Sequence, residues 1–416
     1  MQHAVLRGGV TEVTMVPHQP RTVDADTGQG ADTAERRLRV MQVITHLDMG
    51  GAESVAMSLI DMLRARTDFS LFAVLQKPEL SAVGSEMAAR LAQWDVPVHF
   101  GVGGRFKSGG VVLAARRLVR ELKRFRPDVV HLHTEIPELT FAVAALMSPS
   151  ARTARVLRTV HNSSLWIDWG WIGRGVTTVL GRADAVAVSR HAAAADAAIL
   201  TPGARPTCAV IYNGVAAPDR AAPQPPAAAD APFRLLFAGR LVHQKGADLL
   251  PAILAEAHRR AGRRDVEVTI AGSGALRDGV AQGLSGCCTG WTITMVPPIG
   301  GLAARLREYD AVLLPSRFEG FALLPLEVLM NGVPLITTTA PGLDEAIPAD
   351  YPLAAPVDDV AGLAERLARV IDGTPEYRAV AAHFGAQLAA RFSPANMAQG
   401  YADCYQRIAG AAARTA

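Results

Sequence analysis

The sequence predicts an α/β protein made of two doubly wound, Rossmann-like domains. Three observations support this prediction: short apolar segments alternate with amphipathic helical segments, an Ala/Pro-rich stretch interrupts the alternation near the middle of the chain, and the alternation then begins again. Strands that are separated by helices run parallel, and helices cover both faces of a parallel sheet. Right-handed crossovers make each such sheet doubly wound. The length of 416 residues also fits two domains of ordinary size.

The chain divides into five segments. Residues 1–37 are polar and lack apolar periodicity, so we expect a disordered leader that takes no part in the fold. Residues 38–215 form the first domain and residues 233–392 the second. Residues 216–232 contain five prolines and are predicted to be a linker. Residues 393–416 are predicted to be helical and to pack back on the first domain.

Apolar periodicity predicts the elements of the first domain. A strand at 40–47 leads into Gly50-Gly51, and a helix follows at 54–63, where apolar residues recur at helical spacing. The remaining elements are strands at 70–75, 128–133, 156–160, 185–188 and 210–212, and helices at 82–94 and 111–125.

The second domain repeats this pattern. Its strands are predicted at 233–238, 266–271, 292–295, 311–314 and 334–337. The closing stretch at 361–409 is mostly helical, with breaks at 372–375 and 393–394 where glycine or proline interrupts the pattern.

Composition excludes several classes of protein. The net charge of +3 gives no global basic excess, which argues against nucleic-acid binding. No apolar run approaches the roughly 20 residues of a membrane-spanning helix, and the first residues lack the apolar core of a secretion signal, so we expect a cytoplasmic protein. No Cys-x-x-Cys spacing occurs, and the cysteines are expected to be reduced and buried. They are Cys208, Cys287, Cys288 and Cys404.

Two glycine turns follow predicted strands. Gly50 and Gly51 precede a helix, where residues without a Cβ let backbone amides and the helix N-terminus approach an anion. Gly272 and Ser273 follow a strand of the second domain in the same way. The first turn fits phosphate binding and the second fits a wall of a nucleotide site, and both also fit a purely structural turn.

Two cations follow the first strand of the second domain. Arg240 and Lys245 lie on the loop after the strand at 233–238, and ligands bind at such carboxyl ends in open α/β sheets. An arginine and a lysine together can hold a diphosphate and offset the charge on a departing nucleotide. A solvated basic loop is the alternative.

The densest pattern lies at 309–338. A buried strand leads to Glu319 and Gly320, and a helix that starts near Leu324 carries Glu327. We expect both glutamates to face one crevice, because carboxylates accept paired hydrogen bonds from vicinal hydroxyls of a sugar or a ribose. Two solvated glutamates are the alternative.

One histidine lies at the corresponding edge of the first sheet. His161 follows the strand at 156–160, so its backbone lies at the carboxyl end where ligands bind. A lone histidine in such a place can also be structural.

Together these segments resemble family 4 of the retaining glycosyltransferases, which have the GT-B fold of two Rossmann-like domains facing each other across a cleft. The most specific match is the run from Glu319 to Glu327, EGFALLPLE, which is similar to the family's motif of two glutamates separated by seven residues. Supporting matches, in the family's order, are Gly50-Gly51-Ala52-Glu53, Thr159-Val160-His161-Asn162, Tyr212-Asn213-Gly214-Val215, Gly239-Arg240-Leu241 with Lys245-Gly246, and Ala271-Gly272-Ser273-Gly274. The stretch 337–347 departs from the pattern, because the family's turn is often glycine-rich before its Gly-x-x-Glu ending, whereas here Gly342 of Gly342-Leu343-Asp344-Glu345 is the only glycine.

The resemblance implies an acceptor-binding first domain and a donor-binding second domain. Arg240 and Lys245 would hold the donor diphosphate, Glu327 the ribose and Glu319 the sugar, while His161 would contact the sugar from the first domain. The implied catalytic residues are Glu319, Arg240, Lys245 and His161. The implied donor-binding residues are Gly50, Gly51, Gly272, Ser273, Pro298, Ile299, Gly300, Gly320, Phe321, Ala322, Leu323 and Glu327.

The implied reaction moves a sugar from a nucleotide diphosphate sugar, UDP-sugar in preference to GDP-sugar, to a glycan or lipid-linked acceptor in polysaccharide or cell-envelope glycan biosynthesis. The family is thought to retain the anomeric configuration by front-face substitution without a protein nucleophile, divalent metal or further cofactor. Alternatives with the same architecture are a sugar-nucleotide epimerase, a glycosyl phosphorylase and an inactive nucleotide-binding partner protein.

Two surface features suggest where the acceptor binds. A helix at 111–125 carries a row of basic residues opposite apolar ones, so peripheral contact with an anionic membrane is plausible. The basic residues are Arg116, Arg117, Arg120, Lys123, Arg124 and Arg126, and the apolar residues are Val112, Leu113, Leu118 and Leu122. Trp166, Trp169 and Trp171 fit an acceptor channel, an interfacial patch or core packing equally well.

Overall fold

The computed structural model of the chain describes residues 36–410 except for gaps at 49, 105, 107–108, 167–168, 201–208, 217, 219–230 and 263–264. The predicted leader, most of the predicted linker and Cys208 lie outside the described residues. Strands and helices alternate through the rest of the chain and form two parallel sheets, which confirms the predicted fold class.

The first sheet has seven strands in the order β3-β2-β1-β4-β5-β6-β7. They are β1 (Leu38–His46), β2 (Thr67–Leu75), β3 (Val98–Val102), β4 (Val129–His133), β5 (Val156–Val160), β6 (Asp184–Ala187) and β7 (Ala209–Val210). The order reverses between β1 and β4, and a crevice for a ligand opens at the carboxyl ends of strands beside such a reversal.

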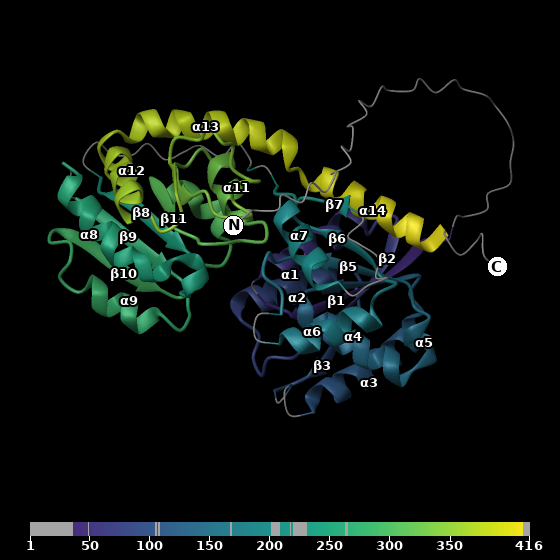
Figure 1. Cartoon of the computed structure of the whole chain (residues 1–416). Coiled ribbons are helices and arrows are strands. Elements are labelled where there is room, and N and C mark those ends of the chain that lie inside the picture. Colours follow the sequence, from purple (N-terminus) through teal and green to yellow (C-terminus); the bar gives the residue numbers. More distant parts are fainter. Residues whose placement is uncertain are drawn as a thin grey trace, which may run out of the picture. The chain divides into compact units, whose positions relative to one another are not determined.

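Helices cover both faces of the first sheet. Alternate residues of β1 belong to different core clusters: Val40 and Ile44 pack in the cluster that includes residues of α1, whereas Met41 and Val43 pack in the cluster that includes residues of α3 and α4. This alternation follows from the strand period of two. The helices are α1 (Gly51–Leu63), α2 (Ala82–Gln93), α3 (Gly110–Phe125), α4 (Glu135–Met147), α5 (Pro149–Arg152), α6 (Gly170–Val179) and α7 (Arg190–Ile199) (Figure 1).

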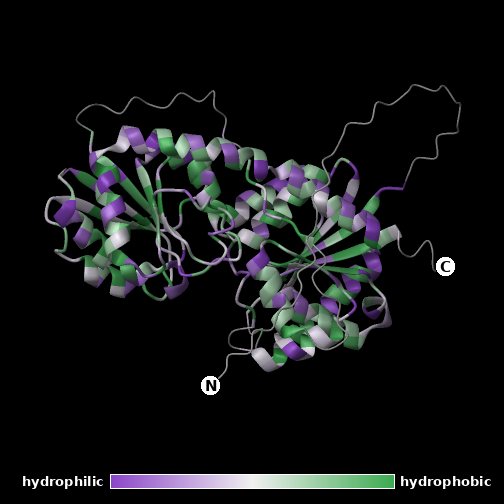
Figure 2. Cartoon of the chain, turned by 45° about the horizontal axis from the view of Figure 1, so that its top comes forward, coloured by the Kyte–Doolittle hydropathy of each residue, from purple (hydrophilic) through white to green (hydrophobic). Residues whose placement is uncertain are grey.

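The second sheet has six strands in the order β10-β9-β8-β11-β12-β13. They are β8 (Phe233–Ala238), β9 (Val266–Ala271), β10 (Trp291–Val296), β11 (Ala311–Leu314), β12 (Leu335–Thr338) and β13 (Ala354–Ala355). The helices are α8 (Leu250–Arg260), α9 (Arg277–Leu284), α10 (Leu302–Arg305), α11 (Leu323–Met330), α12 (Val360–Asp372) and α13 (Thr374–Arg391). Figure 2 shows mostly hydrophobic strands in both sheets and helices that mix hydrophilic and hydrophobic residues.

The last helix, α14 (Pro394–Gly410), packs on the first sheet although it follows the second in sequence. Tyr401 and Tyr405 are buried there among residues of β1 and α1. The amide of Gln42 on β1 donates a hydrogen bond to the Tyr405 hydroxyl at 3.0 Å.

The predicted strands agree with the observed ones to within three residues at each end. The sequence reading did not find β3, whose residues 98–100 are only partly buried at the edge of the sheet, so its apolar pattern is weak. Of the four apolar residues that the sequence places opposite the basic row of α3, Leu118 and Leu122 are buried in the core, whereas Val112 and Leu113 are exposed. Within the described part of the chain, no helix is long and apolar enough to cross a membrane.

Candidate functional site

The residues predicted for the site lie in the loops after the strands of both sheets and on the helices α1 and α11. Two pockets occur among them, one of about 610 Å³ and one of about 290 Å³. The larger pocket is bordered by α1 and α11. The smaller one is bordered by the start of α4 and by the loops that follow β5, β8 and β11.

Lys245 and Glu319 form an ion pair. Nζ of Lys245 lies 2.6 Å from Oε1 of Glu319, and the Ser316 hydroxyl donates to the same oxygen at 2.7 Å. The Glu319 side chain is 7% exposed and that of Lys245 is 19% exposed, so water screens the pair only in part. Because the lysine ammonium has three donors, it keeps capacity to bind a second anion beside Glu319.

The loop that carries Glu319 contacts the loop after β5 closely. A Cβ on Gly320 would lie 1.6 Å from the carbonyl oxygen of His161, so no residue other than glycine fits at this position. The Ser163 hydroxyl donates to the carbonyl oxygen of Glu319 at 2.9 Å. The predicted residues His161 and Glu319 therefore belong to one site, although the 157 residues from Asn162 to Phe318 separate them in the sequence.

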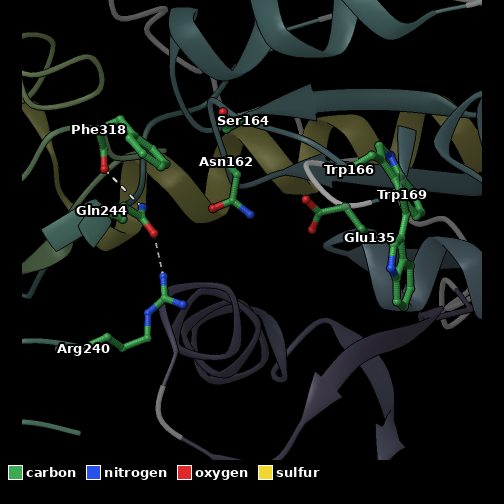
Figure 3. Close-up of a pocket in the computed structure, with 8 residues that line it drawn as sticks. All are labelled: Glu135, Asn162, Ser164, Trp166, Trp169, Arg240, Gln244 and Phe318. Carbon is green, nitrogen blue, oxygen red and sulfur yellow. Dashed lines mark hydrogen bonds between the residues drawn. The ribbon is translucent and has the colours of Figure 1, made fainter. Parts of the chain in front are cut away.

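Arg240 borders the smaller pocket (Figure 3). Its Nη2 donates to Oε1 of Gln244 at 2.8 Å, and Nε2 of Gln244 donates to the carbonyl oxygen of Phe318 at 3.1 Å. Gln244, which the sequence reading did not single out, thus orients the guanidinium toward the pocket.

The opposite side of the smaller pocket is formed by Glu135, Trp166 and Trp169 (Figure 3). Burial raises the pKa of the Glu135 carboxyl, with hydrogen bonds from its own backbone and from Asn162 acting in the other direction. The sequence reading missed Glu135, although its position directly after β4, at the carboxyl edge of the sheet, was a usable signal. Trp166 and Trp169 line this pocket, whereas the third predicted tryptophan, Trp171, is 80% exposed.

Glu327 lies on α11 and borders the larger pocket with Asn331 and residues of α1. Burial raises the pKa of its carboxyl. The carboxylate of Glu319 is instead directed to Lys245 and Ser316, so the two glutamates have different surroundings.

Gly50 and Gly51 begin α1. A Cβ on Gly50 would lie 2.0 Å from Oε2 of Glu53, whereas a Cβ on Gly51 would meet no atom within 4 Å. Glu53 is buried, and burial raises the pKa of its carboxyl from 4.5 to about 7. A Cβ at position 50 would therefore meet only the end of the flexible Glu53 side chain, which would have to shift, and a Cβ at position 51 would displace nothing.

The other predicted donor-binding residues lie at the ends of β9, β10 and β11. Gly272 and Ser273 follow β9 and bond through the backbone to Val296 and Leu241. Pro298, Ile299 and Gly300 follow β10, and Pro298 and Gly300 are exposed. The side chain of Phe321 packs against Tyr212 and Phe392, each with ring centroids 5.2 Å from its own. Ala322 caps α11, and Leu323 is the first residue of that helix.

His161 is almost fully buried, and burial lowers the pKa of its imidazole to about 3. The ring is therefore neutral at physiological pH. Its Nε2 lies 3.0 Å from Nδ1 of His133.

The divergent loop after β12 contacts α7. Glu345 accepts hydrogen bonds from the backbone amides of Arg190 and His191 and from the Tyr212 hydroxyl. Among the described residues, His191, Asp344 and Glu345 are close enough together to hold a metal ion. The hydrogen bonds of Glu345 to the first backbone amides of α7, together with a contact of 2.9 Å between His191 and Asp344, explain why these three residues lie together without a metal ion: they cap the helix.

Two family profiles match this chain, each over one domain. The profile of Glycosyltransferase Family 4 matches residues 49–217, and that of Glycosyl transferases group 1 matches residues 232–373. The chain belongs to glycosyltransferase family 4. The recognition drawn from the Glu319–Glu327 motif is thereby confirmed.

Named relatives of this family 4 protein match part of its length. It is 29% identical to the glycogen synthase of Mycobacterium tuberculosis over 265 residues, which are 60% of this chain and 61% of the relative. It is 36% identical to the D-inositol 3-phosphate glycosyltransferase of an Arthrobacter species over 119 residues, 28% of each chain. The match thus spans about three fifths of the first relative and about a quarter of the second.

Solved structures share the fold over nearly the whole length. Anabaena Alr3699/HepE in complex with UDP and glucose superposes with a TM-score of 0.70 at 18% identity, covering 88% of this family 4 chain and 99% of the other. Sucrose-phosphate synthase from Thermosynechococcus elongatus superposes with a TM-score of 0.70 at 17% identity, covering 90% and 100%. At these identities the comparison establishes the GT-B fold of two Rossmann-like domains.

Proposed function

We propose that this protein is a retaining glycosyltransferase that uses a nucleotide diphosphate sugar, a UDP-sugar in preference to a GDP-sugar. The contact of Lys245 with Glu319 carries the proposal, because it joins a candidate phosphate ligand to a candidate sugar ligand at 2.6 Å. Arg240 lies on the same loop and supplies the second cation that a diphosphate requires. The solved complexes of Alr3699/HepE with UDP and with UDP-glucose support the choice of UDP.

The chemistry assigned to the protein is orientation and electrostatic stabilisation. Arg240 and Lys245 would offset the charge that develops on the departing diphosphate, which is where fixed cations contribute most to a transfer of this kind. Glu319 would hold sugar hydroxyls and Glu327 the ribose. We propose front-face substitution with retention, without a divalent metal or further cofactor, so that no side chain has to act as a nucleophile.

The smaller pocket is proposed as the acceptor site. It joins Arg240, beside the proposed diphosphate, to Glu135, Trp166 and Trp169. A carboxylate can accept a hydrogen bond from an acceptor hydroxyl, and indole rings offer apolar area with a polar edge. These side chains suit a sugar unit of a glycan or of a lipid-linked glycan.

The test of the reaction is release of nucleotide from a panel of UDP- and GDP-sugars in the presence of EDTA, with glycan and lipid-linked acceptors added. We expect one donor to be turned over by the wild type and not by Lys245→Ala or Glu327→Ala. Matched controls are Arg182→Ala and Glu376→Ala, because both side chains are exposed away from the pockets and should leave turnover unchanged. The anomeric configuration of the product, read by NMR, tests retention.

Other outcomes would identify the alternatives. A new sugar nucleotide formed without any acceptor would indicate an epimerase, and release that requires phosphate would indicate a phosphorylase. Nucleotide binding without turnover of any donor would indicate an inactive binding partner. Turnover that EDTA abolishes and Mg²⁺ restores would contradict the metal-independent mechanism.

Peripheral contact with an anionic membrane is also proposed, on a narrower basis than the sequence indicated. On α3, Val112 and Leu113 are 46% and 48% exposed, and the basic residues Arg116, Arg120 and Lys123 are exposed on the same helix. Sedimentation with phosphatidylserine vesicles at low salt, lost on raising the salt and weakened by Arg116→Ala and Lys123→Ala together, is the expected result. Equal sedimentation with neutral vesicles would contradict it.

A further inference from the structure

A chain of buried polar side chains starts at His161 and runs through the first sheet to α14. Nε2 of His161 lies 3.0 Å from Nδ1 of His133, whose own Nε2 lies 2.7 Å from Oε1 of Gln42. Nε2 of Gln42 donates to the hydroxyl of Tyr405 at 3.0 Å. His133 and Gln42 are fully buried, and Tyr405 is 1% exposed.

Stability alone does not explain these polar groups. They lie on β4, β1 and α14 among apolar core residues, where burying a polar group is costly unless it is hydrogen-bonded. Even when bonded, such a group stabilises a core little more than an apolar residue of the same shape would. A role beyond stability is indicated because this chain of hydrogen bonds ends at His161, the residue expected to contact the donor sugar.

The hydrogen bonds fix where the protons lie. The amide oxygen of Gln42 can only accept, so Nε2 of His133 carries a hydrogen. Burial lowers the pKa of His133 and of His161, so both rings are neutral, and Nδ1 of His133 is therefore an acceptor. It takes the hydrogen bond from Nε2 of His161, which leaves Nδ1 of His161 without a hydrogen.

We propose that Gln42 and Tyr405 are positioning residues that hold His161, through His133, in the Nε2–H tautomer, so that Nδ1 accepts a hydrogen bond from a hydroxyl of the donor sugar. The inference depends on the proposed function for the identity of the ligand, but not for the state of the ring. Tyr405 acts by giving the Gln42 amide nitrogen an acceptor. Without that acceptor the amide can turn over, and a reversed amide would impose the opposite tautomer on both histidines.

Tyr401 supplies a matched control on the same helix. The Tyr405 hydroxyl also lies 2.7 Å from Nδ1 of His131, whose Nε2 contacts Thr159 at 2.6 Å. The hydroxyls of Thr159 and Tyr401 are 3.1 Å apart at the far end of this branch. Tyr401 and Tyr405 are equally buried, but the Tyr405 hydroxyl bonds to Gln42 and the Tyr401 hydroxyl to Thr159. Tyr405→Phe therefore removes a hydroxyl that contacts Gln42, and Tyr401→Phe removes one that does not.

The first measurement compares binding of the free nucleotide with binding of the intact donor. His161 is expected to contact the sugar and not the nucleotide. Gln42→Met should therefore weaken binding of the UDP-sugar by about tenfold, the lower end of what a metal-ligating histidine loses with its orienting partner. Tyr405→Phe should weaken it by roughly half that factor, and Tyr401→Phe should leave it unchanged. Affinity for UDP should be the same in all four proteins, whereas a general packing defect would lower both affinities.

The second measurement reads the tautomer directly, without a ligand. In wild-type protein labelled with ¹⁵N-histidine, the ring nitrogens of His161, assigned by their loss in His161→Asn, should show the Nε2–H pattern. Tyr405→Phe should give a mixed pattern and Tyr401→Phe the wild-type one. An Nδ1–H ring in the wild type, or identical behaviour of the two tyrosine variants in both measurements, would overturn the proposal. If no nucleotide sugar binds at all, the proposed function fails, while the spectrum still decides the proton arrangement.

Discussion

The ion pair between Lys245 and Glu319 gives a stability test that separates structure from ligand binding. In Lys245→Met the Glu319 carboxylate stays 7% exposed but loses its cation, and leaving one charge of a buried pair alone costs about 3 kcal/mol. Adding Glu319→Gln removes the stranded charge and should recover most of that loss. Chemical denaturation of the wild type and of both single and double variants measures the coupling.

The double variant should be stable and yet unable to bind the donor diphosphate. If Lys245→Met unfolds at the same denaturant concentration as the wild type, the pair contributes nothing to stability, and its role would then lie only in binding.

Glu53 should make stability and donor binding depend on pH. Its folded pKa of about 7 is higher than the ordinary value of 4.5, so the folded chain binds more protons between these values, and stability falls as pH rises through that window. Glu53→Gln should remove this loss, with a gain that is small at pH 4.5 and approaches about 3 kcal/mol at pH 8. Thermal unfolding of both proteins from pH 4.5 to 8 checks this expectation.

The same carboxyl lies in the first turn of α1, where the diphosphate is proposed to approach. Ionisation above pH 7 should repel that anion, so the KM for the donor should rise from pH 6 to pH 8 in the wild type and stay flat in Glu53→Gln. A parallel rise in both proteins would assign the pH dependence to another group.

Gly51 and Gly320 fit the family motifs for different physical reasons, and alanine substitution should distinguish them. A Cβ at position 51 meets no atom within 4 Å, so Gly51→Ala should leave the unfolding temperature within about a degree of the wild type while weakening donor binding. A Cβ at position 320 would overlap the His161 carbonyl, so Gly320→Ala should destabilise the protein by about 2 kcal/mol or more. Gly279→Ala, which also meets open space but lies on α9, controls for the substitution itself.

At the scale of elements, periodicity predicted what is local. The spacing of apolar residues located α1, α2, α3 and most strands, because each buries a continuous face or stripe. It missed the edge strand β3, where residues 98–100 are only partly buried. On α3 it did not distinguish Val112, which is exposed, from Leu118, which is buried. Which apolar residues of a helix meet the core depends on its neighbours, and a single sequence does not specify them.

The candidate site shows the same division between local and distant information. The strand-end rule found Arg240, Lys245 and His161, since the carboxyl edge of a sheet follows from strand order. The rule did not predict which residues these side chains contact, because the ion pair of Lys245 with Glu319 joins residues 74 apart in the sequence. The bond between Gln42 and Tyr405 spans 363 residues, and sequence periodicity carries no information over such separations.

At the scale of the whole molecule, α14 makes the first domain depend on the end of the chain. Its buried side chains include Met397, Tyr401, Tyr405 and Ile408. Each large side chain contributes about 1.5 to 3 kcal/mol when buried, and together they approach the roughly 5 to 15 kcal/mol that stabilises an ordinary domain. A chain that ends at Phe392 should therefore fail to fold its first domain.

The second domain should survive this truncation, because nearly all residues of its core cluster lie between Phe233 and Phe392 and none lies on α14. Limited trypsin digestion of the shortened chain should degrade the part before residue 216 and leave a resistant fragment that begins near residue 233. A chain that ends at residue 410 retains α14 and should resist digestion throughout both domains. Equal resistance of the two chains would show that the first domain folds without α14. The hydrogen bonds that connect Tyr405 to His161 would then not be needed for the fold, and their proposed role would be limited to the tautomer of His161.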